Sequence, residues 1–234
     1  MQLPQGCCEA RISVTTLLAG RTPEAAAAAL GLDLPGSLAA AIPPRRAEFL
    51  AGRWCARSAL GRAGMHPAAA PAIGPERAPL WPAGFTGSIT HAQGEAWAVV
   101  AADACLRSIG IDLERALDAA AARELQPVLC SPGEPLPAVA VADDASWTDA
   151  QRLALLFSAK ESFYKCVAPL GGRDLGFADA RLLECDAAAG TLRLELLRTA
   201  APGLVRGLQL AGGFALERGR VRTWVAYGVG ITGG

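Results

Sequence analysis

Hydrophobic residues recur at helical spacing over residues 153–165. The members that can share one buried side are Leu153, Leu156, Phe157 and Phe163. Glu161 and Lys165 are four residues apart, so on a helix they lie on one face, one turn apart. Ser158, three residues before Glu161, joins that polar face. The pattern predicts a helix with an acid–base stripe beside an apolar stripe, although an isolated Glu–Lys pair at this spacing is typical of a solvated salt bridge.

Apolar and polar residues alternate from Ile109 to Glu114, which is the period of a half-buried strand. Asp112 and Glu114 are two residues apart and therefore lie side by side on one face. Two adjacent carboxylates are unfavourable at neutral pH unless a cation lies between them. Mg²⁺ is a suitable cation because it binds one or two carboxylates and completes its shell with water and substrate phosphates. The alternative is an outer strand on which both carboxylates face solvent.

The same patterns outline the rest of the chain. The predicted helices cover residues 23–30 and 45–64, and the predicted strands cover residues 96–102, 191–197 and 220–229. We expect the Pro43-Pro44 pair to end the N-terminal region and Gly212-Gly213 to form a turn between the last two strands. The segment 87–91 is expected to lead into the strand at residues 96–102. Proline-rich loops are predicted over residues 66–82 and 130–148, the second as a lid or insertion.

The composition narrows the class of protein. The chain has 234 residues, with 22 Lys or Arg and 22 Asp or Glu, so no net positive charge recruits nucleic acid. Its hydrophobic fraction of 52% is raised by alanine, and we find no membrane span and no signal sequence at the start. Seven cysteines without CxxC spacing indicate reduced thiols and a cytoplasmic protein. Two histidines are too few for a His-rich metal site.

Arg45, Arg53 and Arg57 recur at helical spacing within the helix predicted over residues 45–64. Guanidinium groups bind phosphate through paired donors, so this face is a candidate anion site. The alternative is a solvated basic face. His91 follows in the segment GSITH, where a lone histidine is by default structural.

Two motifs together resemble the 4′-phosphopantetheinyl transferases, the enzymes that prime carrier proteins. They are IGIDLE at residues 109–114 and FSAKESFYK at residues 157–165, about 45 residues further on. Three more stretches resemble the long, single-chain branch that activates enterobactin synthase: RRAEFLAGRWCARSAL (45–60), APLWPAGFTGSITH (78–91) and ARELQPVLCSPGE (122–134). These stretches occur in the order that the branch shows.

The resemblance implies an α+β fold of two similar halves, each a small antiparallel sheet with a long helix, packed face to face. Residues 1–106 would form the N-terminal half, with the coenzyme A-binding helix and loop. Residues 107–234 would form the C-terminal half, with the metal-binding strand and the catalytic helix. The boundary is expected near residues 104–108.

The resemblance also implies the site residues. Those expected to bind coenzyme A are Arg45, Arg53, Arg77, Thr90, His91, Lys160 and Lys165; those expected to hold Mg²⁺, or alternatively Mn²⁺, are Asp112, Glu114 and Glu161; and those expected to be catalytic are Glu161 and Lys165. Thr90 stands where serine is commoner, and both residues offer a hydroxyl. Whether Glu161 is the base, a metal ligand or both stays open.

The reaction implied is attack by a carrier-protein serine on the β-phosphate of coenzyme A, which releases adenosine 3′,5′-bisphosphate. The carrier could be a peptidyl, aryl or acyl carrier from siderophore, other nonribosomal peptide, polyketide or fatty-acid synthesis, and the enzyme is expected to be a monomer. Asp112→Ala is expected to abolish transfer without unfolding the protein, on the premise that Asp112 is a surface carboxylate. The rival hypotheses are another magnesium-dependent phosphoryl enzyme, a non-catalytic protein that binds carriers or coenzyme A, and a purely structural acid–base network.

Overall fold

The computed structural model describes residues 1–115, 119–130, 134–140, 147–217 and 219–228, and it divides the chain into two compact units. The first unit is Gly6–Asp103, and the second unit consists of Met1–Gln5 and Ala104–Gly234. The division lies three residues before the predicted boundary after residue 106, and the first five residues belong to the second unit rather than the first.

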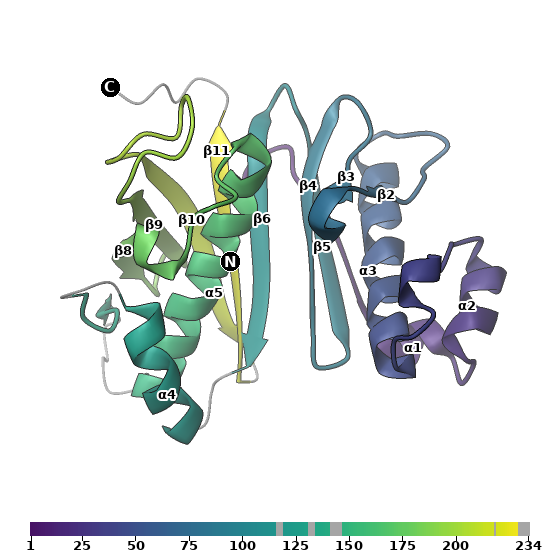
Figure 1. Cartoon of the computed structure of the whole chain (residues 1–234), viewed down its shortest axis with the longest axis horizontal. Coiled ribbons are helices and arrows are strands. Elements are labelled where there is room, and N and C mark those ends of the chain that lie inside the picture. The colour runs from purple at the N-terminus through teal and green to yellow at the C-terminus, as the bar shows by residue number, and fades with distance from the viewer. Residues whose placement is uncertain (116–118, 131–133, 141–146, 218, 229–234) are drawn as a thin grey trace. The chain divides into compact units, whose positions relative to one another are not determined.

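The first unit is a three-stranded antiparallel sheet, with strand order β1-β5-β4, against which the helix α3 packs (Figure 1). Its elements are β1 (Cys8–Ser13), α1 (Val14–Leu18), α2 (Pro23–Leu30), η1 (Gly36–Leu38), α3 (Pro43–Arg62), β2 (Ala72–Ile73), η2 (Pro75–Arg77), β3 (Pro79–Leu80), β4 (Phe85–Ala92) and β5 (Glu95–Ala102). The loop predicted over residues 66–82 contains the small hairpin of β2 and β3. His91 lies within β4 rather than in a segment leading to a strand.

The helix α3 begins at the proline pair instead of following it. Pro43 occupies the first turn, where a backbone N–H would have no partner within the helix and where the fixed φ of proline is already helical. The helix buries an alanine-rich face that includes Ala51, Ala56 and Ala59, so it can lie close to the sheet. The helix lies close to β4 at Gly52, since a Cβ there would lie 2.9 Å from Ile89 Cγ2.

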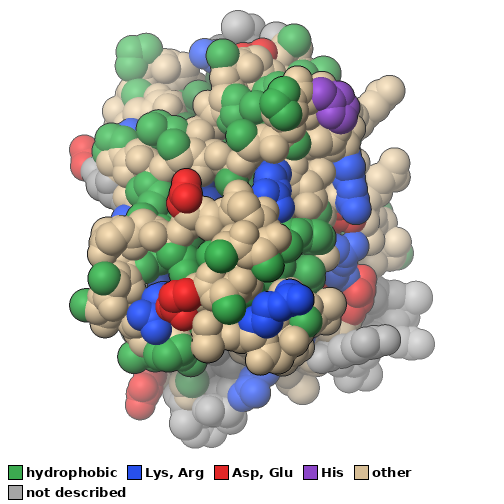
Figure 2. Space-filling model, turned by 90° about the vertical axis from the view of Figure 1, so that its right-hand side faces the viewer, with side chains coloured by type: hydrophobic (Ala, Val, Ile, Leu, Met, Phe, Trp, Pro, Cys, Tyr) green, Lys and Arg blue, Asp and Glu red, His purple; other side chains and the backbone are tan. Residues whose placement is uncertain are grey.

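The surface shown in Figure 2 mixes side chains of different kinds. Hydrophobic side chains alternate with Lys or Arg and with Asp or Glu, and no single sign of charge dominates this face.

The second unit is a six-stranded sheet with strand order β6-β11-β10-β9-β8-β7 (Figure 1). All of its pairs are antiparallel except β7 with β8. Its elements are β6 (Leu106–Arg115), α4 (Ala119–Leu129), β7 (Val139–Ala140), α5 (Asp149–Val167), η4 (Ala168–Leu170), η5 (Phe177–Asp179), β8 (Ala180–Asp186), β9 (Thr191–Leu196), β10 (Gln209–Glu217) and β11 (Arg220–Gly228). Of the loop predicted over residues 130–148, residues 131–133 and 141–146 lie outside the described residues.

The helix α5 starts at a complete capping box. The Thr148 hydroxyl accepts from the backbone N–H of Gln151, and the Gln151 side chain accepts from the backbone N–H of Thr148. The helix then packs along β6 and β11. Its apolar residues, including Phe163 and Val167, join a core with residues of β8 to β11.

The prediction of a turn at Gly212-Gly213 is wrong, because both glycines lie in the middle of β10. A Cβ on Gly212 would meet the Trp224 carbonyl oxygen at 2.3 Å, and a Cβ on Gly213 would meet Trp224 Nε1 at 2.5 Å. These glycines therefore make room for a cross-strand neighbour, which is the other use of glycine in a strand.

The strand β6 is covered by α5 at Gly110. A Cβ at this position would lie 1.9 Å from the Ser162 carbonyl oxygen and 2.5 Å from the Cys166 nitrogen, so only glycine fits. The strand is more buried than the half-buried pattern predicts, because Gly110 and Asp112 are buried as well as the apolar residues beside them, and the alternative in which both carboxylates face solvent does not hold for Asp112.

The α+β class with antiparallel sheets, each with a long helix against it, is confirmed. The two units differ in size, with three strands in the larger sheet of the first and six in the sheet of the second. Within the described ranges, no helix has both the length and the apolar character needed to cross a membrane.

Candidate active site

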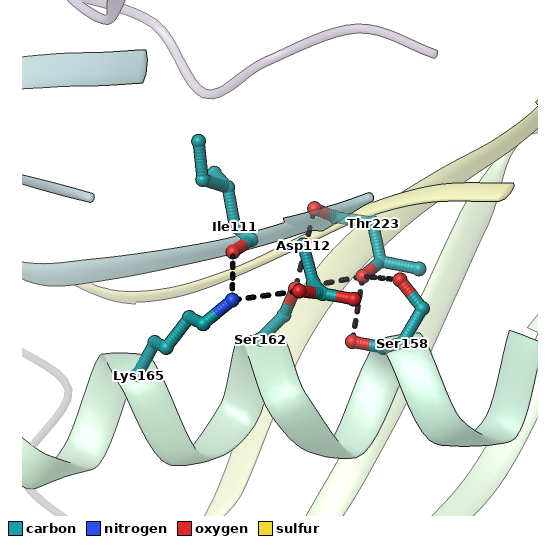
Figure 3. Close-up of polar contacts among 6 residues, drawn as sticks. All are labelled: Ile111, Asp112, Ser158, Ser162, Lys165 and Thr223. Atoms are coloured by element: carbon teal, nitrogen blue, oxygen red, sulfur yellow. Dashed lines mark hydrogen bonds and ion pairs between the residues drawn. The ribbon is translucent and has the colours of Figure 1, made fainter. Parts of the chain in front are cut away.

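An ion pair joins α5 to β6 where the two motifs meet. Lys165 Nζ lies 2.6 Å from Asp112 Oδ1 and donates a second hydrogen bond to the Ile111 carbonyl at 3.3 Å (Figure 3). The Asp112 side chain is only 5% exposed, whereas the Lys165 side chain is 29% exposed. The premise that Asp112 is a surface carboxylate is therefore wrong: it is buried, and a cation compensates its charge.

Glu114 and Glu161 complete an acid–base cluster with Asp112 and Lys165. Burial, together with the charges of Asp112 and Glu161, raises the pKa of Glu114 to about 7, and Lys165 opposes that shift. Burial also raises the pKa of Glu161, which Lys165 lowers and Asp112 raises. The predicted residues of the strand and of the helix are thus close enough to influence one another's charge.

Beside Asp112 lies a hydroxyl cluster of Ser158, Ser162 and Thr223 (Figure 3). Thr223 Oγ1 is 2.9 Å from Ser158 Oγ and 2.7 Å from Ser162 Oγ, and it donates to the Ser158 carbonyl at 2.8 Å. Thr223 is also the partner of Asp112 across β6 and β11. The sequence prediction placed Ser158 on the polar face of Glu161, but the structure buries it in this cluster. Nothing local in the sequence indicates Thr223, because its role depends on strand pairing.

The acid–base cluster has the donors that a hard divalent cation prefers, namely carboxylate oxygens. The raised pKa of Glu114 follows in part from unfavourable charge repulsion with Asp112 and Glu161, which a cation would relieve. The described residues do not themselves bring three His, Cys, Asp or Glu side chains into a ready-made metal cluster. The cation beside Asp112 in this structure is the Lys165 ammonium. The chemistry of Asp112, Glu114 and Glu161 therefore fits Mg²⁺, and their assignment as metal ligands stays a prediction.

The structure does not support the prediction that Lys160 binds a phosphate. Its side chain is 1% exposed, and its ammonium donates to the Leu129 carbonyl at 2.6 Å, Glu134 Oε2 at 2.6 Å and the Phe177 carbonyl at 3.0 Å. An ammonium group has three N–H donors, so none is left for a substrate. Burial lowers the pKa of Lys160, and the hydrogen bond and charge of Glu134 oppose that shift.

Most of the residues predicted to bind coenzyme A in the first unit meet in one pocket of about 140 Å³, which we call the arginine pocket. Its polar lining comprises Ser37, Arg45, Arg53, Arg77 and His91. Arg45 donates to His91 Nε2 at 2.6 Å, so that nitrogen is the acceptor and Nδ1 faces Glu48 Oε2 at 3.5 Å. Thr90 is buried in β4 and does not line this pocket.

Arg53 has a partly structural role in the arginine pocket. It is buried, donates to the Pro71 carbonyl at 2.7 Å and stacks over the Phe49 ring at 5.0 Å. The hydrogen bond to Pro71 attaches the segment before β2 to α3, and the stacking on Phe49 is a contact within α3. Arg77 lies beyond β2 with a φ of 64°, a left-handed conformation that is uncommon for arginine.

A second pocket, of about 190 Å³, lies beside Glu161 in the second unit, and we call it the α5 pocket. It is lined by Lys160, Glu161, Phe163, Tyr164, Leu175, Gly176, Phe177, Asp179 and Ala180. Its lining is largely apolar, with Glu161 among its few polar members. Nothing in the spacing of residues 175–180 indicated that they would lie next to the catalytic helix.

An arginine-lined pocket in one unit and a carboxylate–lysine cluster in the other are the parts of an enzyme that acts on phosphate esters. Comparisons with known proteins make this class specific. Residues 34–101 match the model of the 4′-phosphopantetheinyl transferase N-terminal domain, and residues 108–217 match that of the 4′-phosphopantetheinyl transferase superfamily.

Similar proteins that carry names belong to the same family as these models. The chain is 38% identical over 191 residues to 4′-phosphopantetheinyl transferase Svp of Streptomyces mobaraensis, covering 76% of this chain and 68% of the relative. It is 34% identical over 206 residues to 4′-phosphopantetheinyl transferase Npt of Nocardia iowensis, covering 81% and 86%. Enterobactin synthase component D of Salmonella typhi is 39% identical over 121 residues, covering 52% and 47%.

The chain therefore belongs to the 4′-phosphopantetheinyl transferase family. It is an enzyme that transfers the phosphopantetheine arm of coenzyme A to an apo carrier protein.

Proposed function

We propose that this enzyme primes carrier proteins of nonribosomal peptide assembly. Among these, carriers of siderophore synthesis are the first candidates. The support is its similarity to proteins named enterobactin synthase component D in Salmonella typhi and Escherichia coli. Polyketide and fatty-acid carriers are the competing substrates, and a panel of apo carriers separates them. The monomeric state and the cytoplasmic location stay predictions.

We assign the arginine pocket to the 3′-phosphate end of coenzyme A. Arg45 and Arg77 contribute guanidinium groups to its wall, and these bind phosphate oxygens through paired, charge-assisted hydrogen bonds. His91 is held by Arg45 on one side and faces Glu48 on the other. The guanidinium groups of the arginine pocket favour binding of an anion, and the reacting phosphate is assigned to the second unit.

The reacting centre is the acid–base cluster, and the ion pair between Lys165 and Asp112 is the observation that carries this assignment. When bound by Asp112, Glu114 and Glu161, Mg²⁺ would neutralise charge on the pyrophosphate oxygens. Lys165 is the more exposed member of the pair, and its ammonium can donate a hydrogen bond to a phosphate oxygen.

In the transfer step, the carrier serine oxygen forms a bond to the β-phosphorus, and the bond from that phosphorus to the oxygen of the leaving adenosine 3′,5′-bisphosphate breaks. The serine proton must leave at the same time. Glu161 lines the α5 pocket, and burial raises its pKa, so it is the carboxylate suited to accept that proton. Whether it also binds the metal stays open, because a tight metal ligand is a weak base.

Intact-mass spectrometry of an apo peptidyl carrier, incubated with the enzyme, coenzyme A and Mg²⁺, tests the function. We expect a phosphopantetheine mass increase that EDTA abolishes and that Glu161→Ala reduces by about 10²–10³-fold. A carrier left unmodified while coenzyme A binds would indicate a non-catalytic binder. Consumption of coenzyme A without any carrier would indicate a hydrolase.

Arg45→Gln should raise the KM for coenzyme A about tenfold or more and leave kcat nearly unchanged, because a charge-assisted hydrogen bond contributes about 1.5–3 kcal/mol to binding. Steady-state kinetics with coenzyme A and with 3′-dephospho-coenzyme A measure this. The variant and the wild type should differ far less with the dephospho substrate.

Arg57→Gln is the matched control for Arg45→Gln, since Arg57 lies on the same helix but donates to the Leu30 carbonyl at 2.7 Å, outside the arginine pocket. An equal loss with both substrates would show that Arg45 does not contact the 3′-phosphate.

A further inference from the structure

A buried ion pair between Lys160 and Glu134 joins four elements of the second unit. Lys160 Nζ and Glu134 Oε2 are 2.6 Å apart, and both side chains are at most 2% exposed. The remaining Lys160 donors bind the carbonyls of Leu129 at the end of α4 and of Phe177 in η5. Glu134 Oε1 accepts from the backbone N–H of Leu182 in β8 at 2.9 Å. The pair thereby connects α4, α5, η5 and β8.

Two residues of these contacts, Lys160 and Phe177, line the α5 pocket together with Glu161. Lys160 and Glu161 are adjacent on α5, and both line the α5 pocket. The carbonyl that Lys160 binds belongs to Phe177, which also lines this pocket. The pair therefore connects the helical turn that carries Glu161 to the part of the pocket lining at Phe177.

Stability alone does not explain why this pair is ionic. Removing two charges from water costs about as much free energy as their attraction returns, so a well-packed apolar pair of similar volume is often as stable or more so. An apolar pair makes no directional hydrogen bonds to neighbouring backbone groups. Four hydrogen bonds from two side chains specify where the backbones at Leu129, Phe177 and Leu182 lie relative to α5.

We propose that Glu134 is a positioning residue for transfer: through Lys160, it fixes the wall of the α5 pocket at Phe177 and thereby the placement of Glu161. This inference depends on the proposed role of Glu161 in the reaction. Glu134 itself does not contact the substrate, because its carboxylate is buried and both of its oxygens have protein partners.

The experiment compares the wild type, Glu134→Gln and the double variant Glu134→Leu/Lys160→Met in three measurements. These are thermal unfolding, steady-state transfer kinetics at a temperature where every protein is folded, and hydrogen exchange of the segment 176–182. The double variant replaces the ion pair by apolar side chains. It therefore separates the effect of the pair on the stability of the protein from its effect on the placement of the pocket wall. Glu184→Gln is the control, because Glu184 forms an exposed ion pair with Arg193 on neighbouring strands of the same sheet.

We expect kcat to fall about tenfold or more in both Glu134 variants, with the KM for coenzyme A within about twofold, since the nucleotide end binds the arginine pocket. The double variant should recover the wild-type melting temperature without recovering kcat. Exchange in the segment 176–182 should become faster in both variants, and Glu184→Gln should change none of these quantities.

Wild-type kcat in a stable double variant would overturn the proposal, as would unchanged exchange in the segment 176–182. A double variant that does not fold would also overturn it, by showing that the pair serves folding. Absence of transfer by the wild type would instead refute the proposed function, and the exchange data would still report whether the pair holds the wall.

Discussion

Replacing Asp112 with asparagine will reduce phosphopantetheine transfer by about 10²–10³-fold or more and leave the protein folded. Asparagine keeps the volume of the side chain but removes the charge that pairs with Lys165 at 2.6 Å. Lys165 is partly exposed, so water can solvate its ammonium after the change, and the loss of stability should stay small. Transfer suffers because the cluster loses a predicted metal ligand and the group that orients Lys165.

Mass-spectrometric transfer rates and thermal unfolding, each with and without Mg²⁺, measure both effects of Asp112→Asn. Mg²⁺ should raise the melting temperature of the wild type and not that of the variant, because a ligand stabilises only the state that binds it. Asp33→Asn, at an exposed position in the first unit, is the control. Transfer within tenfold of the wild-type rate would remove Asp112 from the reacting centre. Loss of a cooperative transition would show that the buried ion pair is mainly structural.

Gly110→Ala should destabilise the protein by about 3 kcal/mol or more and abolish transfer, because overpacking a closely packed contact forces the backbone to move. The added carbon would lie 1.9 Å from the Ser162 carbonyl oxygen and 2.5 Å from the Cys166 nitrogen, and both are backbone atoms that no rotamer change can move. α5 must shift away from β6, and this shift separates Lys165 from Asp112.

Chemical unfolding of Gly110→Ala, with transfer measured under native conditions, tests this expectation. Gly36→Ala is the matched control, since a Cβ there has nothing within 4 Å and its backbone is not left-handed. A loss below about 1 kcal/mol together with normal transfer would contradict the view that contact at Gly110 sets the position of the catalytic helix.

The local elements could be predicted from the sequence because their signals are local. The helix around Glu161 and Lys165 and the strand around Asp112 follow from hydrophobic periods of 3.6 and 2. The helix α3 begins and ends two residues before the predicted range 45–64, with Pro43 opening it. Arg45, Arg77 and His91, which the resemblance assigns to coenzyme A, line one pocket, and their role in binding stays a prediction. The turn predicted at Gly212 and Gly213 is wrong, because the sequence alone does not distinguish a glycine in a turn from a glycine at a close cross-strand contact.

The sequence by itself thus determined the family, the main elements and the identity of the acid–base cluster, because motif spacing and periodicity are properties of neighbouring residues. Only the tertiary structure decided which lysine of the motif can reach a substrate. Lys160 and Lys165 are both in FSAKESFYK, yet one is enclosed by Glu134 and two carbonyls and the other stays partly exposed beside Asp112. The tertiary structure also brought Thr223 to Asp112 and α5 to Gly110. These outcomes depend on strand pairing and on the distance between helix and sheet, which involve residues far apart in the chain.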